Sequence, residues 1–131
     1  MSESQPDIYS FLHADSTIAG IVGTRIFPLV LDEGADLPAL TYQVIDVTEE
    51  QTIEGTAANP RHMRVQVDCW AMTYAAIVGL SWEVRRLFDG FQGNMGSVYV
   101  QHTERQNLID SFEPDRKQYR RTLDFIVHFN A

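Results

Sequence analysis

The hydrophobic period of the sequence changes in the middle of residues 63–90, MRVQVDCWAMTYAAIVGLSWEVRRLFDG. Apolar and polar residues alternate over Met63–Ala71, which predicts a strand with one buried face. After Thr73, whose hydroxyl can cap a helix, apolar residues recur at helical spacing as far as Phe88. Gly90 ends the helix because glycine enters the left-handed conformation at least cost. A strand and an amphipathic helix, joined by a short turn, must therefore cover their apolar faces.

The one cysteine of the chain, Cys69, lies on the apolar face of this strand, with Val65 and Val67. A buried cysteine behaves as a small hydrophobic residue, and no second cysteine exists to form a disulfide or a metal-binding pair. We interpret Cys69 as a core residue and not as a nucleophile. Trp70 falls on the polar face of the strand, where either a loop of its own chain or a partner protein would cover it.

The rest of the chain predicts short helices and strands. We expect two helical pieces in residues 6–23, the second capped by Asp15 or Ser16 and ended by Gly20 or Gly23. Pro28 confines a short strand to a sheet edge because proline lacks a backbone N–H. The strands predicted from alternation and turn residues span residues 25–29, 39–50, 61–71, 97–103, 105–113 and 118–130.

These strands follow one another with links of hairpin length, and the helices are gathered instead of alternating with them. The pattern predicts an α+β fold, a mostly antiparallel β-sheet with α-helices packed on one face. A length of 131 residues supports a single domain, over residues 1–131, with a real core.

Charge and hydropathy exclude several classes of protein. The formal net charge of −8 argues against tight binding to nucleic acid, which takes clustered Lys and Arg. No apolar run reaches the ~20 residues of a membrane helix. The N-terminal MSESQPDIYS lacks the basic start and apolar run of a signal peptide, so we expect the protein to stay in the cytoplasm where it is made.

Catalytic and metal-binding patterns are absent from the sequence. The pattern GIVG lacks the basic residues of an RNA-binding clamp loop, and GFQGNMG follows a helix instead of opening one, so we interpret both as turns. The histidines, at positions 13, 62, 102 and 128, lie in separate predicted elements without metal-ligand spacing. We therefore assign no catalytic, cofactor-binding or metal-binding residue and expect no enzyme activity.

The order of elements carries a resemblance to a known family. VGTRIFPL followed by LPALTYQV, the RVQVDCWA.TY joint and the ending FEPD...YRR.LDF resemble the tail-completion, or tail-terminator, family of long-tailed phages and prophages. The resemblance covers nearly the whole chain.

The resemblance implies a structural protein without a cofactor that forms a ring, typically a hexamer, on the head-proximal end of the tail tube. Its implied partners are copies of itself, the tail tube protein and the head-completion or connector protein. The implied location is the head–tail junction of the virion, after assembly in the host cytoplasm. DNA passes through such a ring, and the acidic charge predicts a channel that does not retain it.

Two groups of residues are candidates for these contacts. The polar hairpin tip over Glu49–Pro60 offers little for burial, so we expect it to be disordered in the free protein and ordered in the assembly. Its candidate contacts with the tube, the connector or the channel are Glu49, Glu50, Gln51, Ile53 and Glu54. Trp70 and Arg85 are the candidates for the ring interface.

The alternative from another class is a small cytoplasmic α+β enzyme or ligand-binding domain. It predicts a monomer or a dimer with a site in a cleft between the sheet and the helices, lined by titratable groups.

Overall fold

The computed structural model describes residues 6–49 and 60–130 of the chain. Within these residues the helices are α1 (Ile8–Ala14), α2 (Ser16–Val22) and α3 (Tyr74–Phe88). The strands are β1 (Ile26–Pro28), β2 (Ala39–Glu49), β3 (Pro60–Ala71), β4 (Gly93–Met95), β5 (Val98–Glu113) and β6 (Gln118–Asn130).

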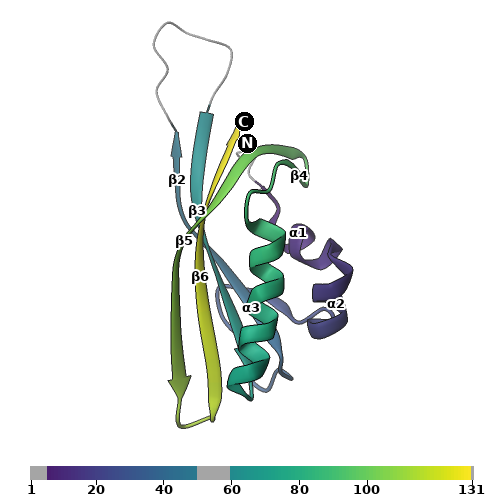
Figure 1. Cartoon of the computed structure of the whole chain (residues 1–131), viewed down its shortest axis with the longest axis vertical. Helices are drawn as coiled ribbons and strands as arrows, with labels where there is room; N and C mark the ends of the chain where they lie inside the picture. Colours follow the sequence, from purple (N-terminus) through teal and green to yellow (C-terminus); the bar gives the residue numbers. More distant parts are fainter. Residues whose placement is uncertain (1–5, 50–59, 131) are drawn as a thin grey trace, which may run out of the picture.

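The strands form one six-stranded sheet in the order β1-β2-β3-β6-β5-β4, and the three helices lie on one of its faces (Figure 1). The neighbours β2 and β3, β3 and β6, β6 and β5, and β5 and β4 pair antiparallel. The predicted α+β class, with its mostly antiparallel sheet and helices on one face, is therefore confirmed.

The core lies between α3 and the central strands. Alternate residues of β3, including Val65, Val67 and Cys69, are buried beneath the helix. The ring of Phe88 stacks on Phe125 of β6, with centroids 4.4 Å apart. Burial raises the pKa of the Cys69 thiol, which keeps it protonated and unreactive. The cysteine is thus part of the core, as its position on the strand predicted.

The helix ends follow from local sequence. The Thr73 hydroxyl accepts a hydrogen bond from the Ala76 N–H at 3.2 Å and caps α3. Beyond the helix, Gly90 adopts a φ of +67° and donates its N–H to the Thr103 carbonyl. Asp15 ends α1 and caps α2 through the Ile18 N–H at 3.0 Å. Thr73 and Asp15 thus satisfy backbone groups that the helices leave free, and the Gly90 N–H fixes the chain after α3 to β5.

The predicted division of residues 97–113 into two strands is wrong. Residues from Val98 to Glu113 form the single strand β5, and the segment interpreted as a glycine turn contains the short strand β4. Two irregularities in the pairing of β5 with β6, after Val100 and after Arg105, shift the alternation of its side chains. A bulge changes the hydrophobic pattern without ending the strand, so the sequence shows a break that the backbone does not have.

The orientation of β1 was not predicted, and the interpretation of GIVG as a turn holds only in part. β1 pairs with β2 in parallel, because the loop from Leu29 to Pro38 returns the chain to the level at which β1 began. The GIVG pattern is not a separate turn: Gly20 lies inside α2, and Gly23 follows that helix with a φ of +61°. No helix of the described residues is long and apolar enough to cross a membrane.

We expect Phe125→Ala to lower the free energy of unfolding by about 3–5 kcal/mol, because it leaves a cavity beside Phe88 in the core. Thr73→Ala removes only the cap of α3 and should cost about 1 kcal/mol. Urea denaturation measures both variants. Equal effects of the two substitutions would contradict this account of the core.

Candidate assembly surfaces

The face of the sheet without helices carries a buried polar cluster centred on Asp68 of β3. Thr122 of β6 and Thr41 of β2 donate hydrogen bonds to its carboxylate, and so does Gln66 of the same strand. The cluster joins three neighbouring strands. The Asp68 carboxylate accepts all of these hydrogen bonds. Its oxygens therefore have partners although the residue is buried.

Trp70 lies beside this cluster and is covered by its own chain. Only 8% of the residue is exposed, and its indole N–H donates to the Thr41 hydroxyl at 3.0 Å. The guanidinium of Arg120 lies over the indole, 5.2 Å from the ring centroid, and also donates to Ser111. The sequence left open whether its own chain or a partner protein covers Trp70, and in the structure its own chain does. A role for Trp70 at a ring interface stays a prediction.

A groove of about 440 Å³ runs over Trp70 on this face. Its lining includes Leu29, Val30 and Leu31 of the loop after β1, Arg116 of the turn before β6 and Gln118 of β6. The groove therefore lies on the helix-free face and not between the sheet and the helices, where the alternative enzyme or ligand-binding domain would have its site.

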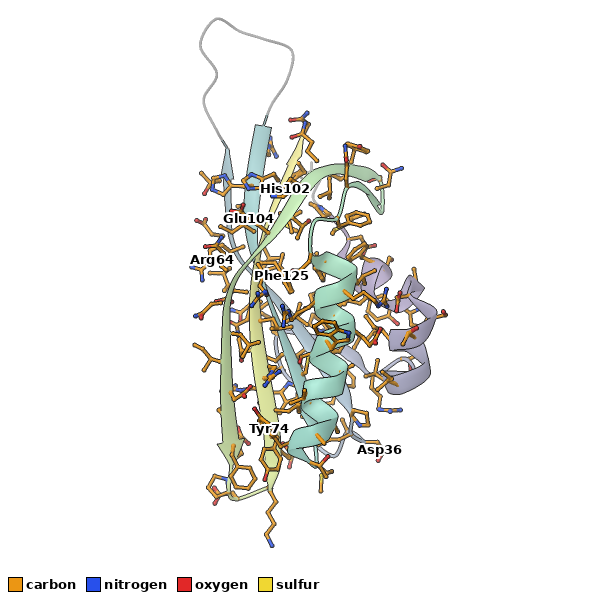
Figure 2. The ribbon with its side chains drawn as sticks, in the orientation of Figure 1. Asp36, Arg64, Tyr74, His102, Glu104 and Phe125 are labelled. Carbon is orange, nitrogen blue, oxygen red and sulfur yellow. The ribbon has the colours of Figure 1, made fainter. Side chains whose placement is uncertain are left out.

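The sheet brings three of the separate histidines together. His62, His128 and His102 occupy successive positions across β3, β6 and β5, with ring centroids 5.7 and 5.9 Å apart. Glu104 lies 3.6 Å from Nε2 of His102 (Figure 2). Across residues 6–49 and 60–130, no group of three or more His, Cys, Asp or Glu side chains is arranged to hold a metal ion. Sequence spacing could not show this row, because cross-strand register creates it.

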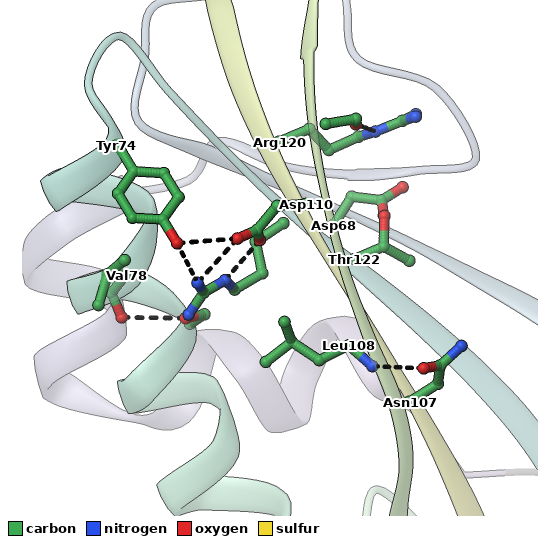
Figure 3. A network of polar contacts seen from close by, with 11 residues as sticks. Asp68, Tyr74, Val78, Asn107, Leu108, Asp110, Arg120 and Thr122 are labelled. Carbon is green, nitrogen blue, oxygen red and sulfur yellow. Dashed lines mark hydrogen bonds and ion pairs between the residues drawn. The ribbon is translucent and has the colours of Figure 1, made fainter.

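A second polar cluster ties α3 to the opposite side of the sheet. Arg121 of β6 donates to both oxygens of Asp110, at 2.7 and 3.0 Å, and to the hydroxyls of Tyr74 and Ser81 (Figure 3). The Tyr74 hydroxyl in turn donates to Asp110 at 3.0 Å. Hydrogen bonds from Arg121 lower the pKa of Asp110. The sequence does carry a signal for this cluster: Arg121 falls on the same face of β6 as the apolar residues Leu123 and Phe125.

Arg85, a predicted interface residue, lies beside an aromatic residue that the sequence analysis did not single out. Its guanidinium stands over the indole of Trp82, 5.4 Å from the ring centroid. Trp82 is 60% exposed, so the pair forms part of the outer surface of α3. Arg86, in contrast, forms ion pairs with Asp15 and Glu83.

Of the contacts predicted for the hairpin tip, only Glu49 belongs to the described residues. Glu49 is the last residue of β2, and β2 and β3 form the predicted hairpin. The other residues predicted to contact the tube, the connector or the channel lie outside the described residues: Glu50, Gln51, Ile53 and Glu54.

Comparison with known families identifies the chain. The profile of the family described as "Tail completion protein gp17" matches residues 6–129. The chain belongs to this tail completion family. The predicted family is thereby confirmed, and the protein is a structural component of a phage tail.

Solved structures agree with the fold of this tail completion protein. Chains of solved structures match it, and one of them belongs to the "Virion of native gene transfer agent (GTA) particle". That chain is 13% identical and has a TM-score of 0.75, and the match covers 95% of the tail completion protein and 92% of the other chain. At this identity the likeness shows a shared fold. The sequence has no significant match among curated proteins.

The Asp110 cluster generates a prediction about pH. Because the folded-state pKa of Asp110 is lowered, its stabilising contribution is present above the unfolded value of about 4 and is lost as the pH falls through the folded value. We expect the stability difference between the wild type and Asp110→Asn to be largest above about pH 5 and to shrink toward pH ~2. Urea unfolding across this range measures it.

The control for this measurement is Glu113→Gln, which changes an exposed carboxylate on the same strand that makes no ion pair with the described residues. Its stability difference from the wild type should stay nearly constant with pH. The assignment fails if Asp110→Asn and Glu113→Gln give the same pH profile.

Proposed function

We propose that this tail completion protein forms a ring, a hexamer, that caps the head-proximal end of the tail tube and joins the tail to the head connector. The observation that carries the proposal is the family match over residues 6–129, which spans nearly every element of the fold. Its partners are then further copies of the chain, the tail tube protein and the head-completion or connector protein. Its place is the head–tail junction of the virion, after assembly in the host cytoplasm.

The unpaired sheet edges support self-assembly. β4 pairs only with residues 98–100 of β5, so within the described chain the outer edge of β5 has no partner strand from Gln101 to Glu113. On the other side, β1 covers β2 only as far as Tyr42. Strand edges of this length can pair with another chain unless a partner strand covers them or their side chains prevent it. A closed ring supplies the cover on both sides of each protomer.

The charge of the chain supports a DNA path through the ring. A net charge of −8 per protomer, repeated around a ring, gives phosphates few cationic partners and lets a genome pass without retention. The same charge makes protomers repel one another at long range, and salt screens this repulsion over ~8 Å at physiological ionic strength. We infer that moderate salt favours ring formation and that the free protein does not bind duplex DNA.

The candidate contacts take separate roles in this proposal. Glu49, which ends β2, and Glu50, Gln51, Ile53 and Glu54 of the predicted hairpin tip are proposed to contact the tube, the connector or the channel. Trp70 and Arg85 are proposed to lie at or near the ring interface. Trp70 acts there by fixing the sheet face, since it is buried in its own protomer, whereas Arg85 contacts the neighbour directly.

Removal of the gene from the encoding genome tests the function. We expect electron micrographs of the particles to show tails without heads and tubes of uncontrolled length, because nothing stops or joins the tube. Expression of the wild-type chain in trans should restore joined particles. Normal particles in the absence of the protein would overturn the proposal.

The hairpin charges give a second test. We expect the combined variant Glu49→Gln/Glu50→Gln/Glu54→Gln to reduce the yield of joined particles at least roughly tenfold, because charged contacts that set partner orientation are lost. Its unfolding midpoint in urea should match the wild type. The control Glu113→Gln/Asp115→Asn removes two carboxylates at the other end of the sheet. Equal yields from the two variants would exclude the hairpin charges from joining.

A further inference from the structure

Four exposed aromatic or apolar side chains and the half-buried Tyr119 follow one another along α3 and onto the sheet. Tyr74, Val78 and Trp82 follow one another at intervals of four residues, so each is one helical turn from the next. At the N-terminal end of α3, the ring centroid of Tyr74 lies 6.1 Å from that of Tyr119 of β6. The ring centroid of Tyr119 lies 4.8 Å from that of Phe112 of β5. We call these five residues the aromatic flank. A continuous exposed patch of this kind marks an interaction site.

The aromatic flank is held in place before any partner binds. The hydroxyl of Tyr74 is fixed by Arg121 and Asp110, and the indole of Trp82 is covered by Arg85 on one side. Side chains fixed in this way lose little conformational entropy on binding. Trp, Tyr and Arg are also the residue types that contribute most to binding energy at protein interfaces.

A second exposed apolar patch follows β1. Leu29 is 65% and Val30 69% exposed, although both are large hydrophobic residues. Leu29 has a φ of +69°, a left-handed conformation that a leucine adopts only with strain, and its N–H donates to the Tyr42 carbonyl at 2.8 Å. The fold therefore maintains a strained backbone that presents two apolar side chains to the outside, which points to a function.

The two patches lie on different faces of the sheet. Leu29 and Val30 line the groove on the helix-free face, together with Glu113 and Gln118, whereas the aromatic flank follows α3 on the helix-covered face. A contact between two different patches of the same chain is head-to-tail, and such contacts build rings when the rotation closes.

We propose that the aromatic flank binds the Leu29–Val30 segment of a second copy of this chain. The inference deepens the proposed function, on which it rests, by naming both halves of the ring contact.

Charge complementarity favours a second copy as the occupant. The segment that follows Val30 carries Asp32, Glu33 and Asp36. Asp32 and Glu33 line a hollow together with Arg116 of their own chain, and none of the three carboxylates forms an ion pair with the described residues. A basic group lies at each end of the aromatic flank. Arg85 lies beside Trp82 at one end. Lys117 lies at the other end, in the turn between β5 and β6. Lys117 has no ion pair with the described residues, and the only partner given for Arg85 is Asp89, at 4.0 Å. In the proposed contact, the acidic segment after Val30 of one copy would face Arg85 and Lys117 of the next. Such basic groups are scarce in a chain with a net charge of −8.

Photo-crosslinking on tail tubes tests the contact. The full chain with Trp82→benzoylphenylalanine is assembled on tubes from the encoding genome, and the captured peptide is identified by mass spectrometry. We expect capture of the peptide that contains Leu29 and Val30 from a second copy. Capture of another segment of the chain, of the tube protein or of the connector protein, or no capture at all, would overturn the inference.

Interface variants give an independent readout. We expect Trp82→Ala and Val30→Asp each to weaken association between protomers at least roughly tenfold, as loss of a central interface residue does. Tyr99→Ala is the control, because Tyr99 is similarly exposed but lies beside β4 at the other end of β5. All three variants should keep the wild-type unfolding midpoint in urea. Unchanged association in Trp82→Ala and Val30→Asp would refute the contact.

Mixing the variants separates a head-to-tail contact from other modes of association. The Trp82→Ala protein keeps an intact Leu29–Val30 segment, and the Val30→Asp protein keeps an intact aromatic flank. Their equimolar mixture should therefore form a one-to-one dimer that neither variant forms alone and that does not grow into a ring. A mixture that stays monomeric would count against the pairing of these two patches.

The same experiments distinguish this inference from the proposed function. Rings on tubes whose crosslinks avoid Leu29 and Val30 would reject the contact and leave the ring function standing. Absence of the wild-type protein from the tube end would reject the proposed function itself.

Discussion

The packing of α3 across β3 and β6 is the constraint on which the rest of the structure depends. One face of each central strand is covered by the helix, and the stack of Phe88 on Phe125 lies at the middle of this contact. The covered face fixes the register of the sheet, because a slip of one residue would expose every buried side chain. The position of each polar residue on the other face follows from that register.

The uncovered face therefore has to satisfy its polar groups by itself. Asp68 collects donors from two neighbouring strands as well as its own, and Trp70 is covered by Arg120 instead of by a helix. The result is a sheet face that is polar, ordered and connected across strands. A surface with these properties suits a protein whose function is structural, because partners meet groups that are already in position.

The two faces of the sheet carry patches of different chemistry, which suits a head-to-tail contact between copies. The segment after β1 presents two exposed apolar residues and acidic residues beside the groove on the helix-free face, whereas the aromatic row follows α3 on the other face. The Arg121 cluster connects that row to the sheet, so the aromatic side chains are fixed to the core. Contacts between two unlike patches of one chain build rings when the rotation closes.

The sequence alone determined the strand-to-helix joint, its Thr73 cap, the burial of Cys69 and the family, because these depend on local periodicity and on residue order. It misjudged β5, since bulges interrupt the alternation of side chains without interrupting the backbone. It named Arg85 but not Trp82, because Trp82 lies outside the apolar stripe by which helical spacing marks the buried face. The Asp68 cluster, the histidine row and the Arg121 cluster were decided only by the tertiary structure. Each joins residues far apart in the chain through cross-strand register, and many interactions summed over the whole core set that register.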